Sequence, residues 1–200
     1  MKTTIRTHLL ATVAGLALAA PLTAQTNSTI TTNDGTGGVS GYVQQNDIGV
    51  FGGTQWHVKN AATNTTRKAY IRFDISNITD PVTAADFDLV VSLLDSNFSS
   101  ADQVINVYGI TNEALDNWDP GTTTWSNAPA NNTSSKFAAD LAQADLLGTI
   151  TVVVAGQNAN SVGDVVTLNN QALIDFLNAD TNGLVTIILG RTVNPEDGRN

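Results

Sequence analysis

The stretch Arg67-Lys68-Ala69-Tyr70-Ile71-Arg72-Phe73-Asp74-Ile75-Ser76 has the clearest pattern in the chain. From Lys68 to Ile75, apolar residues alternate strictly with charged residues and a tyrosine. A period of two is typical of a β-strand, whose successive side chains point to opposite faces. The apolar set predicts a buried face. The other set predicts a solvent-exposed face, which carries Lys68, Tyr70, Arg72 and Asp74.

Seven further segments predict strands, with turn-forming residues between them. They lie at 41–44, 55–60, within 84–94, and at 104–110, 147–155, 165–168 and 184–191. A short helix is expected over 169–178, where apolar residues recur at helical spacing and Asn169 can cap the first turn. Eight short strands at regular spacing favour an all-β fold. We therefore expect a β-sandwich of jelly-roll type with one short helix.

The chain divides into a leader, a lead-in and one domain. Residues 1–24 have two N-terminal cations, an apolar run of about a dozen residues and small residues before a cleavage point after Ala24. This pattern predicts a signal peptide of a secreted bacterial protein, extracellular or at the cell surface. A buried N-terminal helix is the alternative. Residues 25–40 read as an irregular lead-in, and 41–200 as a single β-sandwich domain.

Composition excludes several classes of function. The 200 residues carry a formal net charge of −9, so no broad basic field exists for nucleic acid or an anionic membrane. There is no cysteine, which excludes disulfides and thiolate chemistry. The two histidines are His8, in the leader, and His57, so they cannot form a catalytic pair. We expect a monomer that is not inserted in a membrane after leader cleavage.

The cations outside the leader are few and clustered. Nine Lys and Arg residues occur, two of them in 1–24, and four of the remaining seven lie between positions 59 and 72. If 55–60 and 67–76 form a hairpin, Lys59 shares a face with Lys68 and Arg72. Such a cluster, with Tyr70 to stack on a sugar ring, suits an acidic polysaccharide. The alternative is that these cations form surface ion pairs with Asp74 or other carboxylates.

The long connection after residue 110 contains Trp118 and Trp125. Such connections are usually functional or packed by their own aromatics, so the two rings are either sugar platforms or plugs at one end of the sandwich. No cofactor is predicted. A structural calcium stays open, because several aspartates could supply oxygen ligands, although none has the spacing of an EF-hand. These aspartates are Asp34, Asp47, Asp116 and Asp119.

Several segments, in this order, resemble DNRLRE-type domains, which are also classed as family 96 carbohydrate-binding modules. They are 58–60, 67–76, 107–110, Trp118 with 124–129, and 178–186. The resemblance covers about 41–192. It implies a non-catalytic jelly-roll module of secreted bacterial proteins that binds alginate-like polysaccharide through basic residues. The cations that match are Lys59, Arg67, Lys68, Arg72 and Arg191.

Two departures from the family pattern stand out. Gly41 replaces the usual acidic residue before the first Tyr-Val. The chain stops at Asn200, where members continue to a Ser-Arg-Glu-like segment and a final strand, so the alternatives are a truncated gene product, a fragment of a longer protein or a lost strand.

The leading hypothesis is a non-catalytic module for an acidic, uronate-type polysaccharide. The predicted binding residues are Lys59, Arg67, Lys68, Tyr70, Arg72 and Arg191. The alternative is a structural or adhesive surface domain with no specific sugar site. A lyase or hydrolase is the third hypothesis, because Tyr70, His57 and Arg72 could nominally supply a base and a charge neutraliser.

Overall fold

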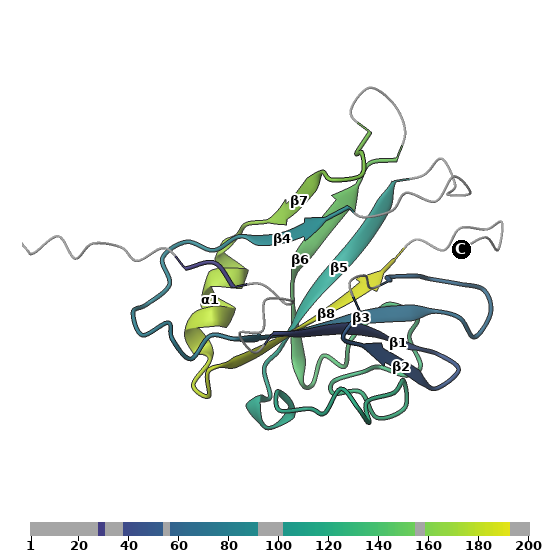
Figure 1. Ribbon diagram of the computed structural model, residues 1–200, viewed down its shortest axis with the longest axis horizontal. Coiled ribbons are helices and arrows are strands. Elements are labelled where there is room, and N and C mark those ends of the chain that lie inside the picture. Colours follow the sequence, from purple (N-terminus) through teal and green to yellow (C-terminus); the bar gives the residue numbers. More distant parts are fainter. Residues whose placement is uncertain (1–27, 31–37, 54–56, 92–101, 155–158, 193–200) are drawn as a thin grey trace, which may run out of the picture.

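In the part of the chain that the structure describes, eight strands, one α-helix and a short 3-10 turn form the regular structure (Figure 1). The computed structural model describes residues 28–30, 38–53, 57–91, 102–154 and 159–192. The elements are β1 (Val39–Gln44), β2 (Ile48–Phe51), β3 (Arg67–Asp74), β4 (Phe87–Val90), β5 (Gln103–Ile110), η1 (Glu113–Leu115), β6 (Ala144–Val152), β7 (Val165–Leu168), α1 (Gln171–Ala179) and β8 (Leu184–Arg191).

The strands form two antiparallel sheets. Six of them pair in the order β2-β1-β3-β8-β5-β6, and β4 pairs with β7 in a second, smaller sheet. The main core lies between the sheets and is completed by α1. It takes Ala69 and Ile71 from β3 and Ile187 and Leu189 from β8. The predicted all-β sandwich with one short helix is confirmed.

Helix α1 begins one residue later than its predicted cap implies. The side chain of Asn170, not Asn169, accepts a hydrogen bond from the main-chain N–H of Leu173 at 2.9 Å. Asn169 instead donates to a carboxylate oxygen of Asp86. Leu173 is the buried residue of the helix and anchors it to the main core.

The second face of the large sheet is covered by the connection 111–143, which lies on the side opposite β4 and β7 in Figure 1. A second core forms there, and it includes Tyr70, Trp118 and Trp125. The prediction of a solvent-exposed face on β3 is therefore wrong, because Lys68 and Tyr70 are both 0% exposed. The two tryptophans are also buried, which confirms that they plug the sandwich.

The connection lies very close to the sheet. A Cβ atom added at Gly190 in β8 would lie 1.9 Å from the carbonyl oxygen of Phe137, and one at Gly49 in β2 would lie 1.9 Å from that of Thr123. Main chain thus rests on main chain at both points, where only glycine leaves enough room. The connection is part of the folded core and not a loosely attached loop.

Within the described residues, the predicted hairpin between 55–60 and β3 is reduced to one antiparallel bridge. Strand β3 pairs with β1 and β8, and the preceding segment touches it only at an isolated bridge between Lys59 and Arg67. The local partner of β1 is instead β2, a strand that the sequence pattern did not predict. Residues 54–56, which include Trp56, lie outside the described residues.

Other predictions fall on parts of the chain that are not described. The expected signal peptide 1–24 and the C-terminal residues 193–200 lie outside the described residues. Strand β1 begins at Val39, so the lead-in ends two residues earlier than expected. Among the described residues, no helix is both long and apolar enough to cross a membrane.

Candidate functional site

The six predicted binding residues lie on opposite faces of the large sheet. Lys68, Tyr70 and Arg72 point toward the 111–143 connection. Arg67 points the other way, and Lys59 shares its face because residues directly opposite in an antiparallel pair project to the same side. Arg191 follows Leu189, a main-core residue, by two positions and therefore also lies on the Arg67 side. The expectation that Lys59 shares a face with Lys68 and Arg72 is wrong.

The 111–143 connection accepts all three hydrogen bonds that the Lys68 ammonium group can donate. Lys68 Nζ donates hydrogen bonds to Asn131 Oδ1 at 2.7 Å, to the Asn132 carbonyl at 2.9 Å and to the Ala138 carbonyl at 2.7 Å. The ammonium also lies 4.7 Å from the ring centroid of Trp125. Burial lowers the pKa of Lys68 to about 7, whereas three oxygen acceptors and the ring favour the charged form. This lysine ties the connection to β3.

Arg72 and Tyr70 act on the same connection. The Arg72 guanidinium donates to the carbonyls of Trp118 at 2.7 Å and Asp116 at 3.3 Å, and lies 5.1 Å from the Trp118 ring centroid. Tyr70 packs edge-on against Trp118, and burial raises its pKa. Asp74 Oδ1 accepts hydrogen bonds from Ser76, which lower the pKa of Asp74, and the charge of Arg72 lowers it to a smaller extent.

The opposite face carries a cluster that we call the basic patch, made of Tyr42, His57, Lys59, Arg67 and Arg191. Arg67 stacks over the Tyr42 ring at 4.8 Å, and its Nε donates to Gln44 Oε1 at 2.7 Å. His57 meets the same ring edge-on, with centroids 5.5 Å apart. His57 is exposed and Tyr42 and Arg67 are partly exposed, whereas Lys59 and Arg191 are buried, at 7% and 3% exposed. The site therefore combines cations with two accessible rings.

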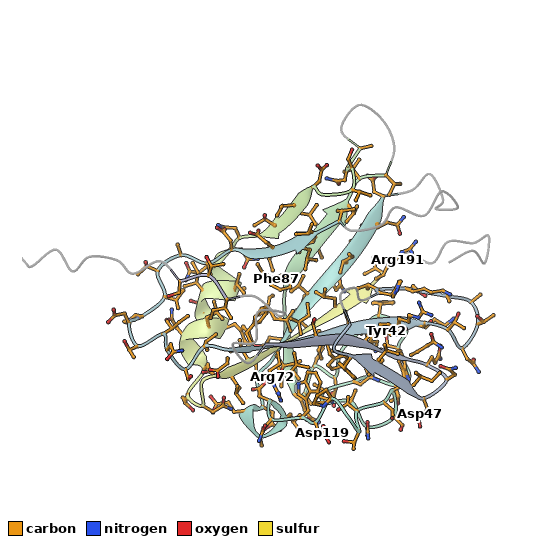
Figure 2. The ribbon with its side chains drawn as sticks, viewed as in Figure 1. Tyr42, Asp47, Arg72, Phe87, Asp119 and Arg191 are labelled. Carbon is orange, nitrogen blue, oxygen red and sulfur yellow. The ribbon has the colours of Figure 1, made fainter. Side chains whose placement is uncertain are left out.

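Figure 2 shows how the sheet separates the two sets. Arg72 lies with Asp119 on the side of the connection, and Phe87 of the main core lies on the side of β4. Tyr42 and Arg191 lie toward the same end of the sheet. The basic patch is thus the end of the core-facing surface that β4 and β7 leave uncovered.

Like charges crowd together in the basic patch. The pKa of Lys59 is lowered by burial and, to a smaller extent, by the charges of Arg67 and Arg191. The pKa of His57 is lowered by burial and then by Arg67 and Lys59, so the imidazole is mostly neutral at pH 7. Mutual repulsion among cations is relieved by an anionic ligand. The patch is therefore suited to bind negative charge.

Comparison with known proteins bears on what this site binds. Residues 40–173 match the model of carbohydrate-binding module family 96. The chain belongs to this family. A search of curated proteins found no match. The matched part of the module contains every residue of the basic patch except Arg191.

Two residues of the module's basic patch were not predicted from sequence. Tyr42 lies opposite Ala69 in β3, and His57 reaches it from the segment before the isolated bridge. Placing β1 beside β3 would have revealed Tyr42, because Ala69 and Arg67 share a face. The nominal lyase set does not form, since Tyr70 is buried on the face opposite His57.

Three of the four aspartates considered for calcium, Asp47, Asp116 and Asp119, lie in the part of the chain that the structure describes. Asp47 accepts a hydrogen bond from the main-chain N–H of Ser126, and Asp119 accepts from Gly121 and Thr122. Across the described residues, no group of three or more His, Asp or Glu side chains could hold a metal ion. Asp34 lies outside these residues.

Proposed function

We propose that this module binds an acidic, uronate-type polysaccharide such as alginate at the basic patch, without catalysing its breakdown. One observation carries the proposal: the partly exposed Arg67 meets two accessible aromatic rings, and the buried Lys59 and Arg191 add positive charge close to it. Guanidinium groups bind carboxylates through paired hydrogen bonds, and lysine adds a point charge. A uronate chain presents a carboxylate on every ring, and such a carboxylate is the group that the positive charge of the patch would attract.

The surface beside the basic patch can contact the sugar rings. Tyr42 lies opposite Val50 of β2, so the two side chains share a face, and Gln44 likewise lies opposite Ile48. Val50 is 41% exposed and Ile48 42% exposed. Pyranose rings have apolar C–H faces that pack on such aromatic and aliphatic groups. Together the cations and this apolar strip distinguish a charged sugar chain from a simple polyanion.

The proposal uses only half of the residues that the sequence predicts. Because the 111–143 connection covers them, Lys68 and Tyr70 have no exposed surface that a ligand could contact. The hydrogen bonds of Arg72 that involve its Nη1 go to the connection. We assign these three residues to holding the module together.

Replacing Arg67 by Ala should weaken alginate binding about tenfold or more, because one charge-assisted contact is worth about 1.5–3 kcal/mol. Affinity electrophoresis or calorimetry with alginate oligomers measures this, with neutral β-glucan as the reference polysaccharide. Raising the salt concentration should also weaken binding. Lys136→Ala is the control for loss of one positive charge outside the patch and should leave affinity unchanged; Lys136 donates to the Ala61 carbonyl, two residues from Lys59, so this variant is also checked for folding.

Equal binding of uronate and neutral polymers would contradict the proposal and favour a structural or adhesive domain. So would an Arg67→Ala variant with wild-type affinity. Absorbance of unsaturated uronate product in the ultraviolet tests for catalysis in the same samples. The meeting of Tyr42, His57 and Arg67 makes that assay necessary, since these residue types can serve β-elimination. We expect no product.

We also propose that the protein is exported from a bacterial cell through residues 1–24. The support is the charged, then apolar, then small-residue pattern of this segment. Mass spectrometry of protein recovered from the medium or cell surface should find an N-terminus at Gln25. Recovery of the uncleaved chain in the cytoplasm alone would contradict export.

A further inference from the structure

A cavity of about 490 Å³ lies at the end of the large sheet remote from the basic patch. Its walls come from the end of β5, the start of β6, helix α1 and the start of β8. Apolar side chains form much of the wall, among them Leu147, Phe176 and Val185. The cavity is large enough for a small organic molecule or one or two sugar residues of a chain.

The charged groups of this cavity are all carboxylates. Its lining contains no lysine, arginine or histidine, and its acidic residues are Glu113, Asp116, Asp145, Asp175 and Asp180. Five carboxylates around an apolar wall produce a strongly negative potential. This concentration of negative charge favours a cationic occupant.

Asp116 gives the cavity a specific anchor. The residue is only 1% exposed, and its Oδ1 has no hydrogen-bond partner, while the carboxylate is also bonded by Thr186. Arg72 reaches the main-chain carbonyl of Asp116 at 3.3 Å. A buried carboxylate oxygen without a donor is costly, and a bound donor would relieve that cost.

The other carboxylates differ in how many of their oxygen atoms already accept hydrogen bonds within the protein. Glu113 accepts two hydrogen bonds from Thr181, one on each oxygen, so it would attract a ligand through its negative charge. Asp180 and Asp175 each have one oxygen engaged, by Gly183 and Gln171 respectively. Each can therefore accept a further hydrogen bond with its second oxygen. The cavity thus offers several acceptors and no donor from a charged side chain.

We infer that this cavity binds an organic ammonium group whose apolar body packs against Phe176 and its neighbours. Within the described residues no three acidic or histidine side chains converge closely enough to hold a metal ion, so spread carboxylates suit an ammonium on a larger body. Amino sugars and free polyamines both present this chemistry. In a carbohydrate-binding module the amino sugar is the source that the fold favours.

The cavity is independent of the basic patch. Val185 lines the cavity and Arg191 belongs to the patch, and Arg191 follows Val185 by six positions in β8, about 20 Å along a strand. Acidic and amino polysaccharides would therefore bind at opposite ends of the module. If experiments show that one of the two sites does not bind its ligand, the other site can still be tested.

Calorimetry or NMR titration of the full chain with glucosamine oligomers tests the inference. We expect binding of these oligomers, and at least tenfold weaker binding of N-acetylglucosamine oligomers of equal length, because acetylation removes the charge. Spermidine is included as a free amine: binding by spermidine alone supports the ammonium site and assigns its ligand to that source. Alginate binding at the patch serves as the internal reference.

Two variants locate the site. Asp116→Asn and Asp175→Asn should each weaken glucosamine-oligomer binding, the first by about tenfold because it removes the buried charge. Asp88→Asn is the matched control: Asp88 is an exposed β4 residue outside the cavity lining and binds Thr167. Equal loss in this control would show a general effect of net charge and overturn the inference.

Asp116→Asn is also checked for folding. The pKa of Asp116 is raised to about 6, mainly by burial and to a smaller extent by the charges of Asp180 and Glu113, while hydrogen bonds from Thr186 oppose the rise. A pKa above the unfolded value of about 3.9 means that the charge destabilises the fold as pH rises through 6. The variant should therefore melt roughly 2–4 °C higher at pH 7.5, with no gain below pH 4.

The remaining outcomes are decisive. A more stable variant that no longer binds the ammonium oligomer supports the site. Equal affinity for acetylated and free-amine oligomers, or no binding of any ammonium probe at millimolar concentration, overturns it. Calcium that competes for the cavity with dependence on Asp116 would make it a metal site, and would also overturn the inference.

Discussion

Lys68→Met should lower the free energy of unfolding by about 2–4 kcal/mol, because three oxygen acceptors lose their donor. These acceptors are Asn131 Oδ1 and the carbonyls of Asn132 and Ala138. Methionine keeps the length of the side chain and avoids the cost of burying a charge, which limits the loss. Urea unfolding followed by far-ultraviolet circular dichroism measures the change.

A second lysine provides the control for this variant. Lys136 is partly exposed and donates to the carbonyls of Ala61 and Ala62. Water can replace it there, so Lys136→Met should change the free energy of unfolding by no more than about 1 kcal/mol. If Lys68→Met proves as mild as Lys136→Met, Lys68 does not hold the connection and its assignment is wrong.

Trp118→Ala should cost about 3–5 kcal/mol of stability, the usual range for removing a large buried aromatic. The Trp118 ring is 8% exposed and packs against Phe51 and Tyr70 beneath Arg72. Its Nε1 donates to Thr186 Oγ1 at 3.1 Å. Trp118→Phe loses only that hydrogen bond and part of the ring, and should cost about 1–2 kcal/mol.

The same variants test whether Trp118 packs the interior of the sandwich or binds a sugar ring. Trp118→Phe should bind alginate as the parent does, since the basic patch lies on the other face of the sheet. Asn117→Ala, at the exposed neighbouring position, should leave stability within about 0.5 kcal/mol. A Trp118→Ala module that keeps its stability but loses polysaccharide binding would contradict the role that we assign to this tryptophan.

Strand positions were largely predictable because hydrophobic alternation is a local property of the chain. The predictions for β7 and β8 agree with the structure at both ends, and those for β3 and β5 agree to within two residues. The pairing of β3 was not predictable in the same way. A hairpin with the preceding segment is the shortest connection, but β1 and β8 offer the continuous ladder.

Lys68 shows why the candidate site was only half predicted. In the sequence, a buried lysine that donates to carbonyls cannot be told from an exposed one, because both alternate with apolar residues. The acceptors lie more than sixty residues away in the connection. Tyr42 and His57 were not predicted as site residues, because each is isolated in the sequence. Only the pairing of the strands brings them to Arg67.

The alternation in 67–76 by itself determined that this segment is a strand, which residues share a face, and that Ala69 and Ile71 enter a core. Tertiary structure decided what covers each face: β4, β7 and α1 on one side, and the 111–143 connection on the other. Periodicity reports side-chain direction, whereas burial depends on chain from elsewhere. The side chains of Lys68 and Arg72 therefore bond to the connection inside the fold, whereas the side chain of Arg67 stays partly exposed on the other face.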